Sequence, residues 1–562
     1  MTEKWSGGSL EMIKTKVFGR IRFDIHENTE KLEFVLPDGC VQSGIPFWHN
    51  DAEFEYDCHG YETVILKGKE CRQTAFTATI PGKHTLRTYI GNEILDEIVF
   101  EAEVAENTGF VQVSDLDPRY FSLSCGTPYT PIGLNLVGCD YDRLPAGMDH
   151  FTASNNTATT GMLQWRRWFG RMQKAGVNYC RIWLSNRYTE ARTEVMGIHD
   201  PLALARFDAL IELARESGVR LKLCMEHWRT FSDENHFAYR RYIDPDTGRQ
   251  LKDENEWFTS SKWNARWMKD IEPYLARCQN DPVVFAWELW NEIDCGEGSF
   301  ESVTGFTKRM LKEIKNISPY NLAVNSLGSF DEESKQERQD CFCEMPEMDF
   351  QQVHRYLDQG APMSICHTDP VAFSIEAVNR SRREDKPVIL TETGAVNDRH
   401  VGPFRFYNSD HDGLIFMDVT YPAFFAGSAG SGHIWHWNQY VETKNLWDHF
   451  KPLADLVEGI QMDAENFISG VIENEEAWIL TLSGNKHTLI LVRNRADRWD
   501  KVLRDGQSPL KIENLRIPVM TKTAKVFWLA NEDPGEIMAE ADGVKLPPFV
   551  HGCVLQIENR QT

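Results

Sequence analysis

Short hydrophobic runs with a two-residue period characterise the first hundred residues. In the segment 17–25, apolar residues alternate with polar ones such as Arg20 and Arg22, which predicts a strand with one buried side and one side in water. The runs 76–80 and 98–104 continue without helical spacing. Several short strands in succession predict an N-terminal β-sandwich.

The pattern changes in the middle of the chain. Short apolar runs alternate there with longer segments of helical period, such as the stripe Phe207, Leu210, Ile211 and Ala214, which Gly218 follows as a C-cap. Eight of the apolar runs have the length of strands: 130–135, 177–183, 220–225, 283–290, 322–327, 350–354, 388–392 and 432–435. Alternating strands and helices predict βα units, which fit either a closed barrel or an open doubly wound sheet.

The strand pattern returns near the C-terminus. The run 478–482, a Gly484–Asn485 turn and the run 489–492 predict a hairpin, and 550–557 has the composition of a closing strand. A small C-terminal β-sandwich accounts for these runs. With the polar segment Ser114–Pro118 read as a linker, we predict three domains: 1–115, 116–458 and 459–562.

Composition and charge argue against two classes of binding partner, nucleic acids and membranes. The 562 residues are 41% hydrophobic and 26% charged, which is ordinary for a globular protein with a sizeable core. The net charge of −24 opposes nucleic-acid binding, because such binding needs Lys and Arg to neutralise phosphates. No apolar stretch is long enough to span a bilayer, and the N-terminus lacks a signal-peptide pattern. We therefore expect neither a nucleic-acid nor a membrane partner.

The number and spacing of the cysteines indicate the redox state of the protein's compartment and whether a zinc site is present. Thirteen of them are scattered along the chain, and an odd, scattered set does not suggest a disulfide framework. Reduced thiols fit the cytoplasm. The closest pair, Cys341 and Cys343, lacks a second pair at zinc-site spacing. We expect a cytoplasmic protein without a metal or other cofactor, and leave open whether it forms homo-oligomers.

Two of the candidate strands end in glutamate. The fourth run, continued through Asn291, ends in Glu292, and the seventh run ends in Glu392. In a closed barrel the carboxyl ends of all strands meet at one face, so both side chains can reach the same mouth. Two carboxylates about 5 to 5.5 Å apart make a retaining glycosidase, in which one attacks the anomeric carbon and the other protonates the leaving oxygen. One such glutamate alone is more simply an ion-pair partner or a helix cap.

At this point the chain resembles the clan A glycoside hydrolases, most closely family 5 in the broad sense. That family has an Asn-Glu pair at the end of strand four and a lone Glu at the end of strand seven, which are matched here by Asn291, Glu292 and Glu392. The resemblance covers roughly residues 128–458 and implies a (β/α)8 TIM barrel. The N-terminal sandwich loosely resembles the accessory domain found ahead of some barrels of this clan.

The resemblance extends to other strand ends. It implies that the following residues bind substrate: Arg181, His227, Asn291, His354, Tyr356 and Trp435, with Trp437 as the alternative to Trp435. A positive charge at Arg181 would stabilise ionised Glu392, and Tyr356 could donate to the same carboxylate. Asn291 is expected to bind the sugar 2-hydroxyl.

The remaining polar residues of these strands have less specific roles. His227 and His354 are expected to hold polar groups rather than transfer protons, because the glutamates already supply acid and nucleophile. Glu226 and Glu288 are expected to point away from the active face by strand alternation.

The expected activity is that of a retaining, exo-acting β-glycosidase on short oligosaccharides or glycosides. The exo expectation has two bases. A cytoplasmic enzyme meets imported oligosaccharides, since long polysaccharides do not cross the membrane. The segment 136–160 is also long for a βα loop and could close one end of a cleft. An endo-acting glycanase, a metal-dependent hydrolase using His227, His354 and His436, and a non-catalytic carbohydrate-binding barrel are the alternatives. The sugar is not identified, because specificity depends on loop residues at the mouth: Asp140, Asn186, Arg187, Trp228, His400 and Asn438.

Overall fold

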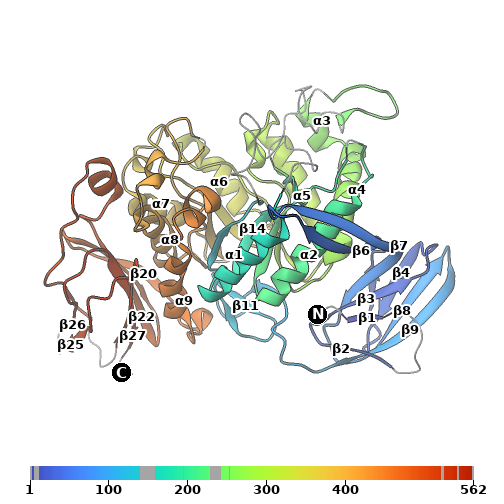
Figure 1. Ribbon diagram of the computed structural model, residues 1–562, viewed down its shortest axis with the longest axis horizontal. Coiled ribbons are helices and arrows are strands. Elements are labelled where there is room, and N and C mark those ends of the chain that lie inside the picture. The colour runs from blue at the N-terminus through green and yellow to red at the C-terminus, as the bar shows by residue number, and fades with distance from the viewer. Residues whose placement is uncertain are drawn as a thin grey trace.

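The chain forms a central barrel with β-sheets on either side, in the order of the sequence (Figure 1). The computed structural model describes the following residues: 3–5, 12–139, 159–193, 195–227, 242–251, 253–400, 402–519, 524–540 and 543–559. The largest buried cluster lies in the barrel and under its helices, and separate clusters fill the N-terminal and C-terminal sheets.

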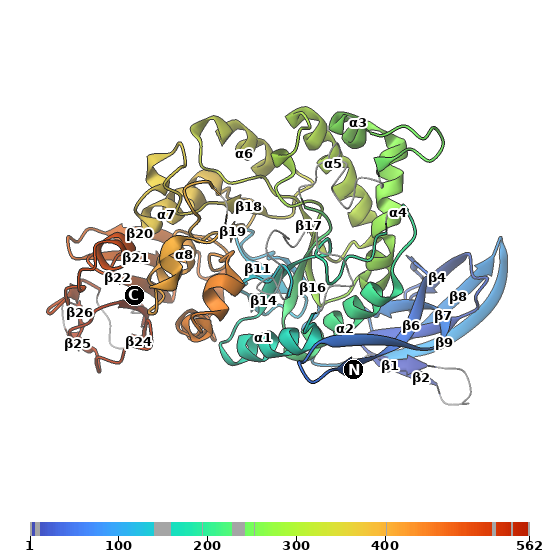
Figure 2. The same cartoon turned by 45° about the horizontal axis from the view of Figure 1, so that its top comes forward.

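The barrel is built from parallel strands with helices outside them (Figure 2). Its strands are β13 (Gly133–Asn135), β14 (Tyr179–Trp183), β15 (Arg220–Cys224), β16 (Val284–Glu288), β17 (Leu322–Val324), β18 (Gln351–His354) and β19 (Val388–Glu392). The first five form one sheet, and β18 pairs with β19. Between the two groups, the Gln352 side chain donates to the Asn325 carbonyl at 3.0 Å.

The strands close into a barrel, which distinguishes this fold from an open doubly wound sheet. The eighth predicted run, 432–435, is reduced to single bridges, in which Ile434 pairs in parallel with both Leu134 and Thr393. These bridges join the last strand position to the first and to the seventh. The prediction of a (β/α)8 barrel is confirmed, and the open doubly wound alternative is wrong.

The outer helices bury the apolar stripes read from the sequence. They are α1 (Met162–Lys174), α2 (Pro201–Ser217), α3 (Glu254–Thr259), α4 (Ser261–Cys278), α5 (Phe300–Ile317), α6 (Gln336–Cys343), α7 (Pro370–Ser381), α8 (Leu414–Phe425) and α9 (Lys451–Val457). Helix α2 ends at Gly218, whose φ of 70° is the left-handed cap conformation that glycine adopts without strain. Among the described helices, none is long and apolar enough to cross a membrane.

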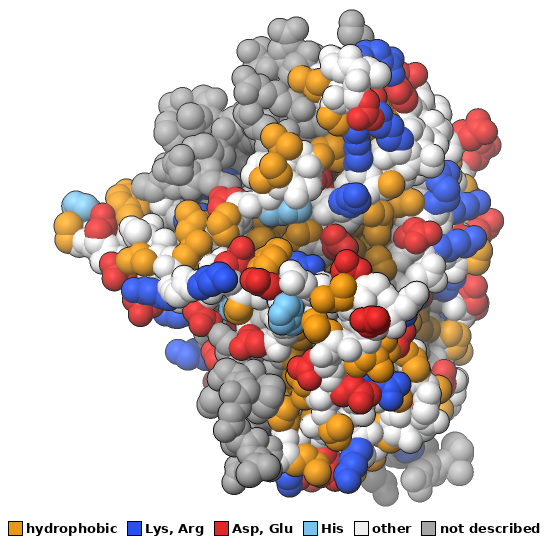
Figure 3. Space-filling model, turned by 90° about the vertical axis from the view of Figure 1, so that its right-hand side faces the viewer, with side chains coloured by type: hydrophobic (Ala, Val, Ile, Leu, Met, Phe, Trp, Pro, Cys, Tyr) orange, Lys and Arg blue, Asp and Glu red, His pale blue; other side chains and the backbone are white. Residues whose placement is uncertain are grey.

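Two sheets make up the N-terminal part. One has the order β1 (Glu3–Trp5), β3 (Arg20–Ile25), β7 (Glu62–Thr77), β6 (Phe47–Tyr56), and the other β2 (Ile13–Lys16), β9 (Glu93–Glu103), β8 (Gly82–Ile90), β4 (Lys31–Val35), β5 (Val41–Gly44). Phe23, Phe34, Phe76 and Phe100 fill the space between them. On the face seen in Figure 3, the acidic and basic side chains of the described residues are interspersed rather than gathered by sign.

The polar side of β3 faces protein, not water as predicted. Arg20 is buried and donates to the carbonyls of Arg277 and Gln279, and Arg22 pairs with Asp208 of α2 at 2.9 Å. The alternation is real, but the second face packs on the barrel helices. Arginine suits this position because its guanidinium can satisfy several buried acceptors.

The connection to the barrel and the C-terminal part also contain sheets. Strands β10 (Val111–Val113), β11 (Phe121–Leu123) and β12 (Pro128–Tyr129) form a small sheet, so the segment predicted as a linker is a turn between β10 and β11. The C-terminal sheet has the order β20 (Ile468–Ile472), β21 (Ala477–Ser483), β22 (His487–Asn494), β27 (Gly552–Glu558), β24 (Ala524–Trp528). A three-stranded sheet lies beside it: β23 (Arg516–Ile517), β26 (Gly543–Lys545) and β25 (Met538–Glu540). The predicted hairpin and closing strand are β21–β22 and β27.

Candidate active site

Glu392 lies at the carboxyl end of β19 with both carboxylate oxygens engaged. Its side chain is 3% exposed. Arg181, from β14, contacts Oε1, and the Tyr356 hydroxyl donates to Oε2 at 2.7 Å. A cation and a donor on a buried carboxylate stabilise its negative charge. The sequence placed these three side chains together, and the structure has them in contact.

Arg181 is itself held by a second carboxylate. Glu288 Oε2 accepts from Arg181 Nε at 2.6 Å and Oε1 accepts from NH2 at 2.9 Å, while Asn291 Oδ1 accepts from the same NH2 at 2.7 Å. Burial alone would raise the pKa of Glu288, but the charges of Arg181 and Lys222 lower it to about 2. The expectation that Glu288 points away from the active face is wrong. Strand β16 ends at Glu288, and Glu292 lies in the turn beyond it, so strand alternation counted from Glu292 does not set the direction of the Glu288 side chain.

Lys222 completes a group of charges inside the barrel. Its ammonium lies 3.4 Å from Glu288 Oε2 and contacts the Gln352 side chain. Burial lowers the pKa of Lys222 to about 8, against the opposing effect of Glu288. The lysine is therefore largely charged at neutral pH. Glu226, by contrast, pairs with Arg192 at 2.6 Å, away from this group.

Glu292 differs from Glu392 in its surroundings. Its backbone has a φ of 52°, a left-handed conformation that costs free energy in a residue other than glycine and is concentrated at functional sites. The backbone N–H donates to Ser326 Oγ at 3.0 Å, which helps to hold this turn. Burial, with the nearby charge of Asp294, raises the pKa of Glu292 to about 7. Glu292 is therefore substantially protonated near neutral pH.

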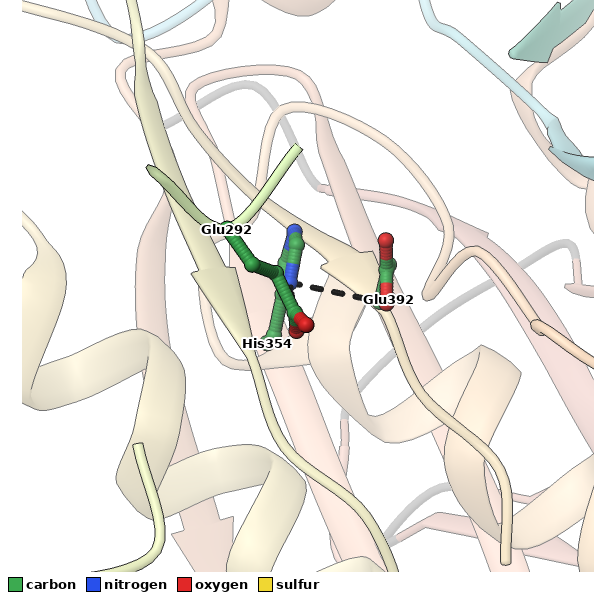
Figure 4. A group of neighbouring side chains, drawn as sticks. All are labelled: Glu292, His354 and Glu392. Atoms are coloured by element: carbon green, nitrogen blue, oxygen red, sulfur yellow. Dashed lines mark hydrogen bonds and ion pairs between the residues drawn. The ribbon is translucent and has the colours of Figure 1, made fainter. Parts of the chain in front are cut away.

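His354 lies between the two carboxylates (Figure 4). Its Nδ1 is 2.9 Å from Glu292 Oε1 and 3.5 Å from Glu392 Oε2. Burial lowers the pKa of His354 to about 4, even though the charge of Glu392 opposes this, so the ring is neutral at pH 7. One oxygen of each glutamate and the His354 nitrogen lie within 4.8 Å of one another. The two carboxylates thus face one another across a neutral imidazole.

The rings of His227, Trp183 and Trp435 form an aromatic wall beside these residues. The His227 ring stacks on Trp183 at 5.0 Å between centroids, and Trp183 lies 5.2 Å from Trp435. His227 Nδ1 and Ser185 Oγ are 2.5 Å apart. Trp435 is partly exposed and Trp437 is buried, which leaves Trp435 as the better placed of the two alternatives for stacking on a sugar.

The loop residues named for specificity are only partly described. Asn186 is buried and bonded to the Trp183 carbonyl, and Asn438 is also buried. His400 is half exposed and lies 2.5 Å from Asp358. Asp140, Trp228 and most of the segment 136–160 lie outside the described residues.

Two groups of side chains in the described ranges have the spacing to hold a cation. One is Glu292, His354 and Glu392, and the other is Asp331, Asp358 and His400. In the second group Asp331 already pairs with Lys335 at 2.6 Å. The histidines of the metal-dependent alternative, His227, His354 and His436, do not form such a group.

Four residues of this site were not predicted: Trp183, Ser185, Lys222 and Ser326. Trp183 is the last residue of β14, so its place at a strand end was a usable signal. Nothing in the local sequence marks the two serines, because each acts on a residue far along the chain.

Comparison with known proteins identifies the barrel. Residues 145–421 match the sequence profile of the cellulase family, glycosyl hydrolase family 5. The chain is 25% identical over 168 residues to the mannan endo-1,4-beta-mannosidase F of Aspergillus fumigatus, covering 27% of this chain and 36% of that protein. It is 22% identical over 320 residues to the mannan endo-1,4-beta-mannosidase 1 of Arabidopsis thaliana, covering 50% and 74%.

A solved structure shares the fold over nearly the whole chain. This protein of Bacteroides vulgatus, assigned to the glycoside hydrolases, has a TM-score of 0.55 and 15% identity, and the match covers 98% of this chain and 100% of that one. The first curated relatives are matched over only about a third of their length. The family profile and the ordered strand ends of the barrel agree, and the central barrel is a glycosyl hydrolase family 5 domain.

Proposed function

We propose that the protein is a retaining β-glycosidase in which Glu392 is the nucleophile and Glu292 the general acid and base. The observation that carries this proposal is the pairing of two unlike carboxylates with oxygens within 4.8 Å. Retaining enzymes have carboxyl groups about 5 to 5.5 Å apart, whereas inverting enzymes leave about 6.5 to 9.5 Å for a water. The different surroundings of the two carboxylates support these roles. Glu392 contacts Arg181, which keeps it ionised, whereas burial raises the pKa of Glu292, which keeps it protonated.

The proposed reaction has two steps. Glu292 first gives its proton to the glycosidic oxygen while a Glu392 oxygen bonds to the anomeric carbon and the leaving group departs. Ionised Glu292 then takes a proton from water, whose oxygen attacks the same carbon and releases Glu392. The Asn291 amide oxygen is already bonded to Arg181, so its NH2 group is the part left to bind the sugar 2-hydroxyl.

The pH dependence of the first step follows from Glu292. Because burial raises its pKa to about 7, the protonated acid is present below that pH and is lost as the pH rises through it. We expect kcat/KM for a substrate with a poor leaving group to fall tenfold per pH unit above about 7. A pH series from 4 to 10 measures this. A flat profile between pH 6 and 9 would contradict Glu292 as the acid.

For the substrate we propose terminal β-mannosyl units of short saccharides. The names of the curated relatives support a β-mannoside, although those names describe endo-acting enzymes. The exo proposal rests on the length of the segment 136–160, whose described ends are held firmly. Cys139 is buried, and the Thr159 carbonyl accepts from the Glu62 N–H at 2.7 Å. The thirteen free cysteines favour a reducing compartment.

Product analysis tests the mode of action. We expect an end-labelled β-1,4-mannooligosaccharide series to release monosaccharide from the first minutes, and aryl β-mannoside to be cleaved faster than aryl β-glucoside, galactoside, xyloside or fucoside. Mid-sized fragments appearing before any mono- or disaccharide would instead establish endo action. A different preferred aryl sugar would correct the substrate while leaving the mechanism in place.

A further inference from the structure

The N-terminal part reaches the barrel through a long hairpin formed by β6 and β7. Figures 1 and 2 both show this hairpin running from the N-terminal sheets to lie beside α1 and α2. Glu62 is the first residue of β7 and pairs with Tyr56 next to the turn. Its side chain is 0% exposed, although it carries a carboxylate. A buried carboxylate at a hairpin tip needs strong partners.

In the described part of the chain, the hydrogen-bond partners of the Glu62 carboxylate all belong to the barrel. Oε2 accepts from the Met162 N–H at 2.7 Å, both oxygens accept from the Tyr188 hydroxyl at 3.0 and 3.1 Å, and Oε1 accepts from Arg206 Nε at 3.0 Å. These residues lie at the start of α1, in the loop after β14 and on α2 respectively. A Cβ on Gly161 would lie 2.1 Å from Oε2, so the backbone there is shaped around this carboxylate.

The loop that holds Tyr188 also carries part of the sugar-binding wall. It begins directly after Trp183, the residue that lies between His227 and Trp435. Ser185 of the same loop contacts His227. The far side of the loop is fixed by the Tyr274 hydroxyl, which donates to the Thr189 carbonyl at 2.7 Å. Glu62 and Tyr274 therefore hold this loop from two directions.

We propose that Glu62 is a positioning residue through which the N-terminal domain sets the loop after β14, and with it the aromatic wall of the substrate site. The N-terminal domain is then part of the substrate-binding structure rather than an appendage. The inference rests on the proposed glycosidase function for its kinetic consequence. It predicts weaker substrate binding, not slower chemistry, when the Glu62 contacts are lost, because neither carboxylate of the reaction touches them.

Two variants of the full-length protein test this. Glu62→Gln keeps the shape of the side chain but replaces one of its two accepting oxygens by a donating NH2 group, so it cannot accept from both the Met162 N–H and Arg206 Nε. Tyr188→Phe removes only the hydroxyl that reaches Glu62. The matched control is Arg22→Gln, which breaks another ion pair between the N-terminal sheets and the same helix α2, at 2.9 Å, without touching a loop at the barrel mouth. All three are expected to lower the melting temperature.

The kinetic readout separates positioning from mere domain attachment. On the aryl β-glycoside that the unmodified enzyme cleaves best, we expect Glu62→Gln and Tyr188→Phe to raise KM roughly tenfold with kcat within about threefold. Arg22→Gln should leave KM within about twofold. The double variant Glu62→Gln/Tyr188→Phe should be no worse than the poorer single one, because the two residues share one contact. Equal KM changes in Glu62→Gln and Arg22→Gln, or none in either, would overturn the inference.

A second readout does not depend on activity. Hydrogen exchange of backbone amides in residues 179–193 should become faster in Glu62→Gln and stay unchanged in Arg22→Gln. If the unmodified protein cleaves no glycoside, the proposed function fails, and this exchange comparison decides the positioning role alone. Unchanged exchange in Glu62→Gln would refute it.

Discussion

Replacing Glu392 by alanine is expected to reduce kcat on the order of 10⁴-fold or more, because the carbon-oxygen bond of the glycosyl-enzyme can no longer form. Measured kcat for an activated aryl glycoside gives this value. The variant should remain folded, although Arg181 then keeps only Glu288 as a carboxylate partner. Glu384→Ala, on an exposed residue shortly before β19, is the matched control and should retain full activity.

Trapping identifies the nucleophile directly. A 2-deoxy-2-fluoro sugar with a good leaving group slows the second step, so the glycosyl-enzyme accumulates and mass spectrometry of the digested protein should find the sugar on Glu392. Label on another residue would reassign the nucleophile. Inversion at the anomeric carbon, observed by NMR, would contradict double displacement altogether.

The second large effect concerns Glu292. We expect Glu292→Ala to lower kcat/KM roughly 10² to 10⁴-fold for substrates with poor leaving groups, and far less for dinitrophenyl glycosides, which need no proton in the first step. The fall in rate above pH 7 should disappear from the profile. Glu297→Ala, an exposed residue of the same loop, serves as the control.

Azide distinguishes the acid and base from the nucleophile. Added to Glu292→Ala, azide attacks the glycosyl-enzyme without base assistance, so it should restore turnover of the activated substrate and give a β-glycosyl azide. Rescue of the Glu392 variant with retained configuration, and not of the Glu292 variant, would mean that the two roles are exchanged.

The barrel was largely predictable because each strand is a separate apolar run. Buried parallel strands need apolar residues on both faces, and seven runs contain the strands observed. The eighth was overestimated. The backbone at 432–435 makes only bridges at Ile434, although the apolar composition of the run resembles that of a strand. An apolar composition indicates that a segment is buried. A strand also needs a neighbouring strand of matching length with which to form backbone hydrogen bonds.

The site was predictable where residues lie at strand ends and less so where they act across the chain. Arg181, Tyr356 and Glu392 meet because barrel topology brings strand ends together. The pairing of Glu288 with Arg181 was missed because the strand was assumed to continue to Glu292, whereas β16 ends at Glu288 and the chain turns beyond it. The contact of Glu62 with Tyr188 joins residues 126 positions apart in separate domains, and no local pattern encodes such a contact.

The charges inside the barrel have a consequence for the second step of the proposed reaction. In the free enzyme Arg181 and Lys222 are balanced by Glu288 and Glu392. Once Glu392 carries the sugar as an ester it is neutral, and Glu292, which has given up its proton, is the carboxylate that faces the same positive charges. Loss of the negative charge of Glu392, within 4.8 Å, lowers the pKa of Glu292 in the intermediate. The charges inside the barrel therefore favour Glu292 as an ionised base in the second step, after it has acted as an acid in the first.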